Sequence, residues 1–264
     1  MLDRPLISTD RLAAVLTDVR VIDVRWSLAD PSGGRSGYEA GHIPGAVFVD
    51  LDAEITGSEG LGRHPLPTRE QFQDAMRRAG VGRDTDVVVY DDAGGSSAAR
   101  LWWLFKAFGH DGVAVLDGGL QAWTGELESG TRTYPQGDFE ATEIDRSMIA
   151  TIGEIETAKV LLDARAPERY RGETEPVDPV PGHIPGAINV FWQSNLREDG
   201  VFRSPVELRA AYERFGEDVI VYCGSGVNAC HDVLAMEVAG LRRPRVYAGS
   251  YSEWSRTPGK PIQR

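Results

Sequence analysis

Cysteine is scarce in this chain: only Cys223 and Cys230 are present among 264 residues. Two cysteines cannot form the disulfide framework that is typical of small secreted domains. Long apolar runs are also missing, since no segment is long enough to span a membrane and residues 1–5 carry no apolar signal region. We therefore expect a cytoplasmic protein with reduced thiols and no membrane association.

Basic residues are outnumbered, with 28 Lys and Arg against 40 Asp and Glu, and the formal net charge is −12. So acidic a chain is a poor partner for nucleic acid or for an anionic membrane surface. A small anionic substrate is still compatible with this charge, because one arginine or one helix end can override the global field locally. The sequence also has no His and Cys cluster at metal-ligand spacing and no motif for an organic cofactor, so we expect neither.

The first half of the chain is repeated in the second half. Short motifs recur in the same order at 21–25 and 161–165, at 38–46 and 181–187, at 87–91 and 219–223, and at 117–123 and 248–254. A period of about 130–140 residues indicates two tandem domains rather than a solenoid. We place the first domain at 1–130, a linker rich in Gly, Thr and Pro at 131–145, and the second domain at 146–264.

Each half alternates apolar strands with helical segments. Such alternation predicts an α/β fold in which each domain has a parallel sheet with helices on both faces. The expected strands are 21–24, 47–49, 87–90 and 113–116 in the first half, and 160–163, 188–190 and 219–222 in the second. The expected helices are 10–16 (capped by Ser8 or Thr9), 69–79, 98–108, 149–157, 205–215 and 232–239.

The most informative stretch is the end of the strand at 219–222. Cys223 follows that strand directly, Gly224 and Gly226 lie within the next three residues, and a helical segment follows. Open α/β sheets bind ligands at the carboxyl ends of their strands, and the amino end of a helix favours an anion. This placement predicts a reactive thiolate, although a buried, merely packed Cys223 is the alternative.

The paired Gly-His-Ile-Pro-Gly-Ala motifs and the single cysteine loop resemble the rhodanese-type sulfurtransferases, specifically the two-domain thiosulfate and 3-mercaptopyruvate enzymes. The resemblance covers nearly the whole chain. It implies two rhodanese-like domains and transfer of a sulfane sulfur through a persulfide on Cys223, cradled by the backbone N–H groups of Gly224, Ser225, Gly226, Val227 and Asn228. The first domain has Asp91 where the cysteine would stand, and aspartate cannot carry sulfur, so we expect that domain to be non-catalytic.

The loop sequence bears on the sulfur donor. In thiosulfate enzymes of this type the loop is similar to Cys-Arg-Lys-Gly-Val-Thr. The loop here, Cys-Gly-Ser-Gly-Val-Asn at 223–228, is instead similar to that of the 3-mercaptopyruvate type. In the 3-mercaptopyruvate enzymes of the family, two arginines bind the carboxylate of the substrate. Arg169 matches the first of them, but the position of the second is occupied by Val177. Arg171 is a nearby candidate to replace the missing arginine. 3-Mercaptopyruvate is therefore slightly favoured over thiosulfate as donor.

The resemblance also implies a proton relay. Asp52 and His64 match an aspartate and a histidine of the family, and with Ser225 they would pass a proton to the leaving pyruvate enolate. The expected acceptors are cyanide or a thiol, with thioredoxin or glutathione as further expectations from the family.

Other residues favour structural roles. His42 and His183 recur in both halves, including the half without the cysteine, so we expect them to fix a turn through a hydrogen bond. Cys230 fits a packed thiol better than a disulfide partner. Arg169 has an alternative as a surface ion pair with Glu168 or Glu173, and the acid-rich stretch 173–178 is expected to be a solvated loop.

Two other functions compete with sulfur transfer. A cysteine-dependent protein phosphatase needs an arginine six residues after its cysteine to bind phosphate oxygens, and that position is Ala229 here. A non-catalytic sulfur carrier or binding module is the other alternative, and measured turnover would distinguish it from an enzyme.

Overall fold

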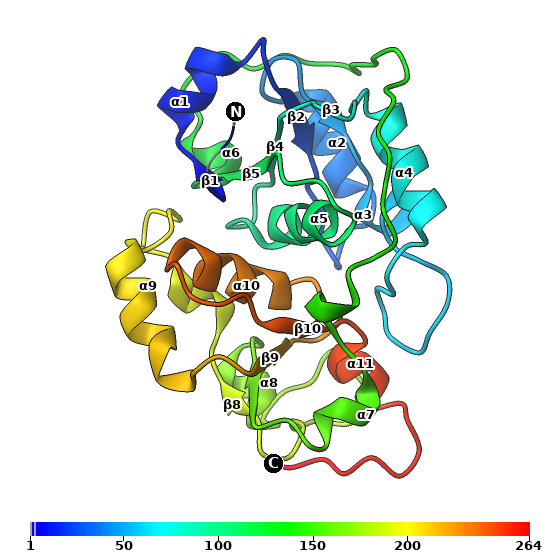
Figure 1. Ribbon diagram of the computed structural model, residues 1–264, viewed down its shortest axis with the longest axis vertical. Helices are drawn as coiled ribbons and strands as arrows, with labels where there is room; N and C mark the ends of the chain where they lie inside the picture. The colour runs from blue at the N-terminus through cyan, green and yellow to red at the C-terminus, as the bar shows by residue number, and fades with distance from the viewer. Residues whose placement is uncertain (1, 3) are drawn as a thin grey trace. The chain divides into compact units, whose positions relative to one another are not determined.

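The computed structural model describes Leu2 and residues 4–264 (Figure 1). The chain divides into two compact units. The first contains the chain up to Gly57, together with Pro67–Ile144 and Glu198–Phe202, and the second contains Ser58–Leu66, Asp145–Arg197 and Arg203–Arg264. A loop from the first half of the sequence, Ser58–Leu66, is therefore part of the second unit.

The first unit has a five-stranded parallel sheet in the order β1-β5-β4-β2-β3. Its strands are β1 (Leu6–Ile7), β2 (Arg20–Asp23), β3 (Val47–Phe48), β4 (Val87–Tyr90) and β5 (Val113–Leu116). Its helices are α1 (Thr9–Val15), α2 (Gly33–Ala40), α3 (Leu51–Glu54), α4 (Arg69–Arg78), α5 (Ser96–Ala107) and α6 (Gly119–Ala122).

The second unit repeats this sheet in the order β6-β10-β9-β7-β8, again with every pair parallel. Its strands are β6 (Ile149–Ala150), β7 (Val160–Asp163), β8 (Ile188–Asn189), β9 (Val219–Tyr222) and β10 (Arg245–Tyr247). Its helices are α7 (Ile152–Ile155), α8 (Pro167–Tyr170), α9 (Pro205–Tyr212), α10 (Ala229–Val238) and α11 (Ser250–Trp254), with short 3₁₀ turns at Arg146–Met148, Trp192–Asn195 and Glu213–Phe215.

The predicted fold class, two tandem α/β domains each with a parallel sheet and helices on both faces, is confirmed. The central strands β4 and β9 are buried at every position, as expected for strands covered on both sides. The helix expected at 149–157 is wrong in part, because residues 149–150 form the edge strand β6 and only Ile152–Ile155 are helical. Strands of two or three residues, such as β1, β6 and β10, are too short to show a periodic pattern.

The segment interpreted as a linker is packed rather than free. Phe139 is buried, and its ring lies edge-on against Phe72 and Phe105 at centroid distances of 5.8 Å. The side chain of Arg77 donates a hydrogen bond to the Phe139 carbonyl at 2.8 Å. The stretch before Ile144 therefore belongs to the first unit by its contacts, and the boundaries drawn from the sequence stay a prediction.

A buried polar network supports α10 from within the second unit. Asp232, in the first turn of α10, is fully buried and accepts a hydrogen bond from Asn195 Nδ2 at 2.8 Å. The Tyr212 hydroxyl in turn donates to Asn195 Oδ1 at 2.8 Å. Burial raises the pKa of Asp232 to about 8, although the hydrogen bonds from Asn195 and Tyr212 oppose this.

This raised pKa predicts that the contribution of Asp232 to the stability of the protein falls as the pH rises. An aspartate in the unfolded chain has a pKa of about 3.9. From about pH 4 to about pH 8, the folded protein holds a proton on Asp232 that the unfolded chain has released, which costs about 1.4 kcal/mol per pH unit. Asp232→Asn replaces the titrating carboxyl group by an amide that does not titrate, so the variant gains stability relative to the wild type as the pH is raised.

Urea unfolding at about pH 5, 6, 7 and 8 measures the difference, since it reports the free energy of unfolding at each pH. The matched control is Asp84→Asn at an exposed aspartate, which should follow the wild type at every pH. Equal pH slopes for the wild type and Asp232→Asn would contradict the prediction.

Candidate active site

Cys223 occupies the turn between the carboxyl end of β9 and the amino end of α10. Its side chain is only 3% exposed, and the backbone N–H of Gly226 donates to its Sγ at 3.1 Å. Gly226 has φ of +81°, and a Cβ there would lie 2.6 Å from the carbonyl oxygen of Ala248. Glycine is therefore required at this position, both for the backbone conformation and for the close approach of the neighbouring chain. Val227 and Asn228 complete the turn: Val227 is buried, and Asn228 is the N-cap residue of α10.

The start of α11 holds the cysteine loop in place. The amide of Cys223 donates to Ser250 Oγ at 3.2 Å, and its carbonyl accepts from the amide of Tyr251 at 3.0 Å. The amide of Ser252 donates to the carbonyl of Gly224 at 2.9 Å. In the sequence this stretch stands out only as a repeat of 117–123. The repeat is a usable signal, because the first unit makes the equivalent hydrogen bond from Leu120 N to the Asp91 carbonyl at 2.9 Å.

The corresponding loop of the first unit shows what such a turn binds. The Asp91 carboxylate is fully buried and lies inside its own loop, where it accepts from the amides of Ala93, Gly95 and Ala98 at 2.8–2.9 Å and from Ser97 Oγ at 3.0 Å. The donors of this turn thus converge on one anionic side chain. The loop around Cys223 follows the same strand-to-helix turn in the second unit and carries a neutral thiol or a thiolate at that position.

Two of the residues predicted for the site lie against this loop. His64 Nδ1 and Ser225 Oγ are 2.7 Å apart, and both side chains are buried. His64 reaches the loop because Ser58–Leu66 belongs to the second unit, where Arg63 N also donates to Ser252 Oγ at 3.0 Å. The structure thus brings Cys223, Ser225 and His64 together.

Asp52, the other residue predicted for the relay, lies in α3 of the first unit. Its carboxylate accepts a hydrogen bond from Trp26 Nε1 at 2.8 Å. Its predicted part in the reaction stays a prediction.

Arg169 lies beside the loop and is held by two carboxylates. Its guanidinium donates to Glu175 Oε1 at 2.6 Å and to Asp178 Oδ2 at 3.3 Å. A Cβ on Gly224 would lie 3.4 Å from Arg169 Nη1, which shows how close the guanidinium comes to the residue after Cys223. The alternative interpretation, a surface ion pair of Arg169 with Glu168 or Glu173, is wrong in its partners, since Arg169 pairs with Glu175 and Asp178.

The interpretation of 173–178 as a solvated loop is also wrong for two of its acids. The side chains of Glu175 and Asp178 are 2% and 0% exposed. Glu175 pairs with the nearby Arg165 and Arg169. Asp178 pairs with Arg169 and also with arginines distant in the sequence, Arg63 and Arg256. Burial works to raise the pKa of Glu175, but the hydrogen bonds from Arg169 and from backbone amides lower it overall. Glu175 and Asp178 were missed as parts of the site, and their identity as acids gave no signal for burial.

Arg171, the candidate to replace the arginine absent at Val177, does not share this environment. Its side chain is 53% exposed and pairs with Glu173 at 2.7 Å. Arg63 does approach the loop, since a Cβ on Gly224 would lie 3.0 Å from its Nη2. It was not among the residues predicted for the site.

The residues predicted to be structural behave as such. His183 Nδ1 is 2.8 Å from the Tyr170 carbonyl, and its ring stacks on Tyr170 at 3.9 Å. His42 has the same two interactions with Tyr38 in the first unit. Cys230 is a free, buried thiol that donates to the Gly226 carbonyl at 3.3 Å, as expected for a packed thiol.

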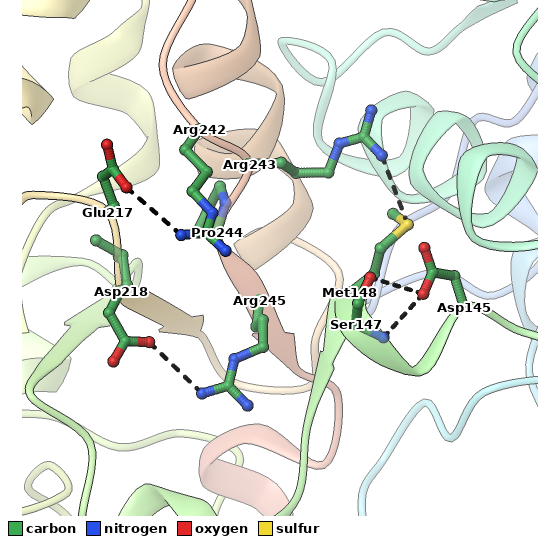
Figure 2. Close-up of a pocket in the computed structure, with 10 residues that line it drawn as sticks. Asp145, Ser147, Met148, Glu217, Asp218, Arg242, Arg243, Pro244 and Arg245 are labelled. Atoms are coloured by element: carbon green, nitrogen blue, oxygen red, sulfur yellow. Dashed lines mark hydrogen bonds and ion pairs between the residues drawn. The ribbon is translucent and has the colours of Figure 1, made fainter.

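A hollow of the second unit lies at the opposite edge of its sheet, at the amino-terminal ends of β9 and β10 (Figure 2). Its arginines have partners: Arg242 pairs with Glu217 at 3.5 Å and Arg245 with Asp218 at 3.8 Å. Arg243 pairs with Glu237 at 2.7 Å. Because these charges are paired and ligands of parallel sheets bind at the other edge, this hollow is a weaker candidate than the Cys223 loop.

Over Leu2 and residues 4–264, no group of three His, Cys, Asp or Glu side chains is arranged to hold a metal ion. Over the same residues, no helix has the length and apolar character needed to cross a bilayer.

Comparison with known proteins identifies the family. The model of the rhodanese-like domain matches residues 8–126 and again 150–257. A probable 3-mercaptopyruvate sulfurtransferase of Pseudomonas aeruginosa is 41% identical, over 97% of this chain and 97% of its own. A putative thiosulfate sulfurtransferase of Mycobacterium tuberculosis is 42% identical, over 98% and 96% of the two chains.

Solved structures agree with these relatives. The 3-mercaptopyruvate sulfurtransferase of Leishmania major superimposes with a TM-score of 0.88 at 31% identity, over 98% of this chain and 76% of that one. The Escherichia coli enzyme has a TM-score of 0.83 at 33% identity, over 95% and 100% of the two chains. With both halves matched by the family model and relatives that align from end to end, the chain belongs to the rhodanese family of sulfurtransferases.

Proposed function

We propose that this enzyme moves a sulfane sulfur from 3-mercaptopyruvate to a thiophilic acceptor through a persulfide on Cys223. The observation that carries the proposal is the position of Cys223 Sγ in a turn built to bind an anion, with the pair formed by His64 and Ser225 next to it. A thiolate there is a good nucleophile, and the persulfide that replaces it is again an anion suited to the same donors.

The first half-reaction breaks the carbon–sulfur bond of the donor. The Cys223 thiolate attacks the donor sulfur, a sulfur–sulfur bond forms, and the electron pair of the broken bond leaves with the three-carbon fragment as an enolate. Protonation of the enolate carbon gives pyruvate. In the second half-reaction the acceptor, cyanide or a thiol, attacks the outer sulfur, and the thiolate of Cys223 is regenerated.

The proton for the enolate comes from the pair formed by His64 and Ser225. Their 2.7 Å contact joins an imidazole to a hydroxyl of the cysteine loop, so a proton can pass between the two groups beside Cys223. Asp52 completes the relay in the resemblance on which this role rests. The contact between His64 and Ser225 is the observation that supports this step.

The choice of donor rests on the loop. Between Cys223 and Asn228 the loop has no cationic residue. The loop typical of thiosulfate enzymes has two, an arginine and a lysine, which match the two negative charges of thiosulfate. Thiosulfate is the alternative donor, and the name of the mycobacterial relative points to it. Thioredoxin or glutathione as acceptor, and a cytoplasmic location in which Cys223 and Cys230 stay reduced, complete the proposal.

The first prediction concerns the nucleophile and the donor. With cyanide as acceptor, kcat/KM is expected to be higher for 3-mercaptopyruvate than for thiosulfate, and Cys223→Ser abolishes both activities. Thiocyanate formation measures turnover, and mass spectrometry of the enzyme after exposure to donor alone detects the added sulfur atom. Cys230→Ser is the matched control, since a hydroxyl still donates to the Gly226 carbonyl.

Each result of that experiment has a definite meaning. A higher kcat/KM for thiosulfate would refute the choice of donor and leave the persulfide intact. Turnover with neither donor would refute the enzymatic proposal and favour the sulfur-carrier alternative.

The second prediction separates the proton relay from the nucleophile. His64→Ala and Ser225→Ala are expected to lower kcat with 3-mercaptopyruvate by about 10²–10⁴-fold, because the enolate has lost its general acid. Thiosulfate releases sulfite, which needs no proton to leave, so the loss with thiosulfate should be much smaller. The double variant should be about as slow as either single variant, because two residues that act as a unit do not contribute additively. Equal losses with both donors would instead show that the pair supports the loop and not the proton transfer.

A further inference from the structure

Arg63 belongs to the second unit and was not predicted from the sequence as a residue of the site. It lies in the loop Ser58–Leu66, directly before His64, and its Nη1 pairs with Asp178 Oδ1 at 2.7 Å. A Cβ on Gly224 would lie 3.0 Å from Arg63 Nη2. The guanidinium therefore reaches the residue that follows Cys223 and stands there with the guanidinium of Arg169.

The Arg63 side chain is not fully satisfied. It is only 18% exposed, and its Nε is buried without a hydrogen-bond partner among the described residues. A buried donor that lacks a partner costs free energy, and a bound water, ion or ligand can supply the missing acceptor.

The charges around Gly224 do not cancel. Arg63, Arg169 and Arg256 surround the carboxylates of Glu175 and Asp178, and Arg256 Nη1 lies 3.0 Å from Asp178 Oδ1. Three guanidinium groups against two carboxylates leave one positive charge in excess. The two arginines nearest to Gly224 are thereby oriented by ion pairs and still attract an anion.

Gly224 lets both guanidinium groups come close to the residue after Cys223. A Cβ at this position would meet Arg63 Nη2 at 3.0 Å and Arg169 Nη1 at 3.4 Å, so a larger side chain would push them away. An anionic group that contacts both guanidinium groups would therefore lie close to the nucleophilic sulfur.

We propose that Arg63, together with Arg169, binds the carboxylate of a small sulfur donor that reacts with Cys223. This makes Arg63 the second arginine of the site, the part considered above for Arg171. The proposal deepens the function proposed above and rests on it, because the carboxylate belongs to 3-mercaptopyruvate or to another donor of the same class.

The test compares two alkylating reagents that differ in a carboxylate. Iodoacetate and neutral iodoacetamide react with Cys223 in the same way: the thiolate forms a sulfur–carbon bond and iodide leaves with the electron pair of the broken carbon–iodine bond. Peptide mass spectrometry follows alkylation at Cys223 apart from Cys230. In the wild type, Arg63 should favour iodoacetate.

Arg63→Ala is expected to lower the ratio of the iodoacetate rate to the iodoacetamide rate by about 10–100-fold, the usual worth of one charge-assisted hydrogen bond. Arg63→Lys should recover part of the ratio, because it keeps the charge but not the fork of donors. Arg171→Ala is the matched control: it removes an arginine of the same unit that is paired with Glu173, and it should leave the ratio unchanged.

Two outcomes would overturn the proposal. One is an unchanged ratio in Arg63→Ala. The other is an equal fall of both rates, which would show that Arg63 supports the loop and does not bind the carboxylate. Neither outcome depends on sulfur transfer, so a failure of the proposed function, seen as absent turnover in the wild type, is distinguishable from a failure of this inference.

Turnover gives a second readout. With 3-mercaptopyruvate as donor, Arg63→Ala should raise KM by about 10-fold or more and change kcat less, since the carboxylate contact is the same in the substrate and in the transition state. An unchanged KM in an enzyme that does turn over 3-mercaptopyruvate would also overturn the proposal.

Discussion

The second unit depends on one buried guanidinium. Arg165 follows β7 and donates to Asp163 Oδ2 at 2.7 Å and to the Gly182 carbonyl at 2.7 Å, and a third contact reaches Glu175 Oε2 at 3.3 Å. Burial opposes the charged form, but Asp163 raises the pKa of Arg165 overall, and the ring of Tyr251 lies 3.9 Å from its guanidinium carbon. The Arg165 side chain thus connects three parts of the unit: the end of β7 at Asp163, the turn at Gly182, and the acidic segment at Glu175. Removal of one partner from such a buried set leaves an uncompensated charge, which makes the arrangement all-or-none.

The order of this ion-pair chain explains why the arginines at the cysteine loop are positioned in advance. Glu175 takes its orientation from Arg165 and then holds Arg169, while Asp178 is shared by Arg169 and Arg63. Each guanidinium beside Gly224 has therefore already lost its rotamer freedom in the folded protein. A ligand that binds there need not order these long side chains, so more of its interaction energy is available as affinity.

The sequence predicted what is local or repeated and missed what depends on distant partners. The central strands β4, β5, β7 and β9 lie where their apolar runs placed them, because such a run is the direct signature of a covered parallel strand. The cysteine turn was predicted for the same reason, since strand, cysteine, glycines and helix are contiguous.

The acids Glu175 and Asp178 were misassigned because an acidic stretch is usually solvated. Their ion pairs form only in the folded unit, and two of the arginines around Asp178 lie far away in the sequence. Arg63 escaped notice because nothing in its neighbourhood shows that Ser58–Leu66 folds with the second unit.

Asp91 gives the non-catalytic half a distinct thermodynamic character. Its carboxylate is an intramolecular ligand for its own turn and is present at an effective concentration that no dissolved anion can match. The donors of that turn are therefore satisfied without a bound ligand, and the occupied turn adds to the stability of the first unit. The second unit has Cys223 in place of this tethered carboxylate, so its turn is left for an anion that can be exchanged, such as the persulfide proposed above.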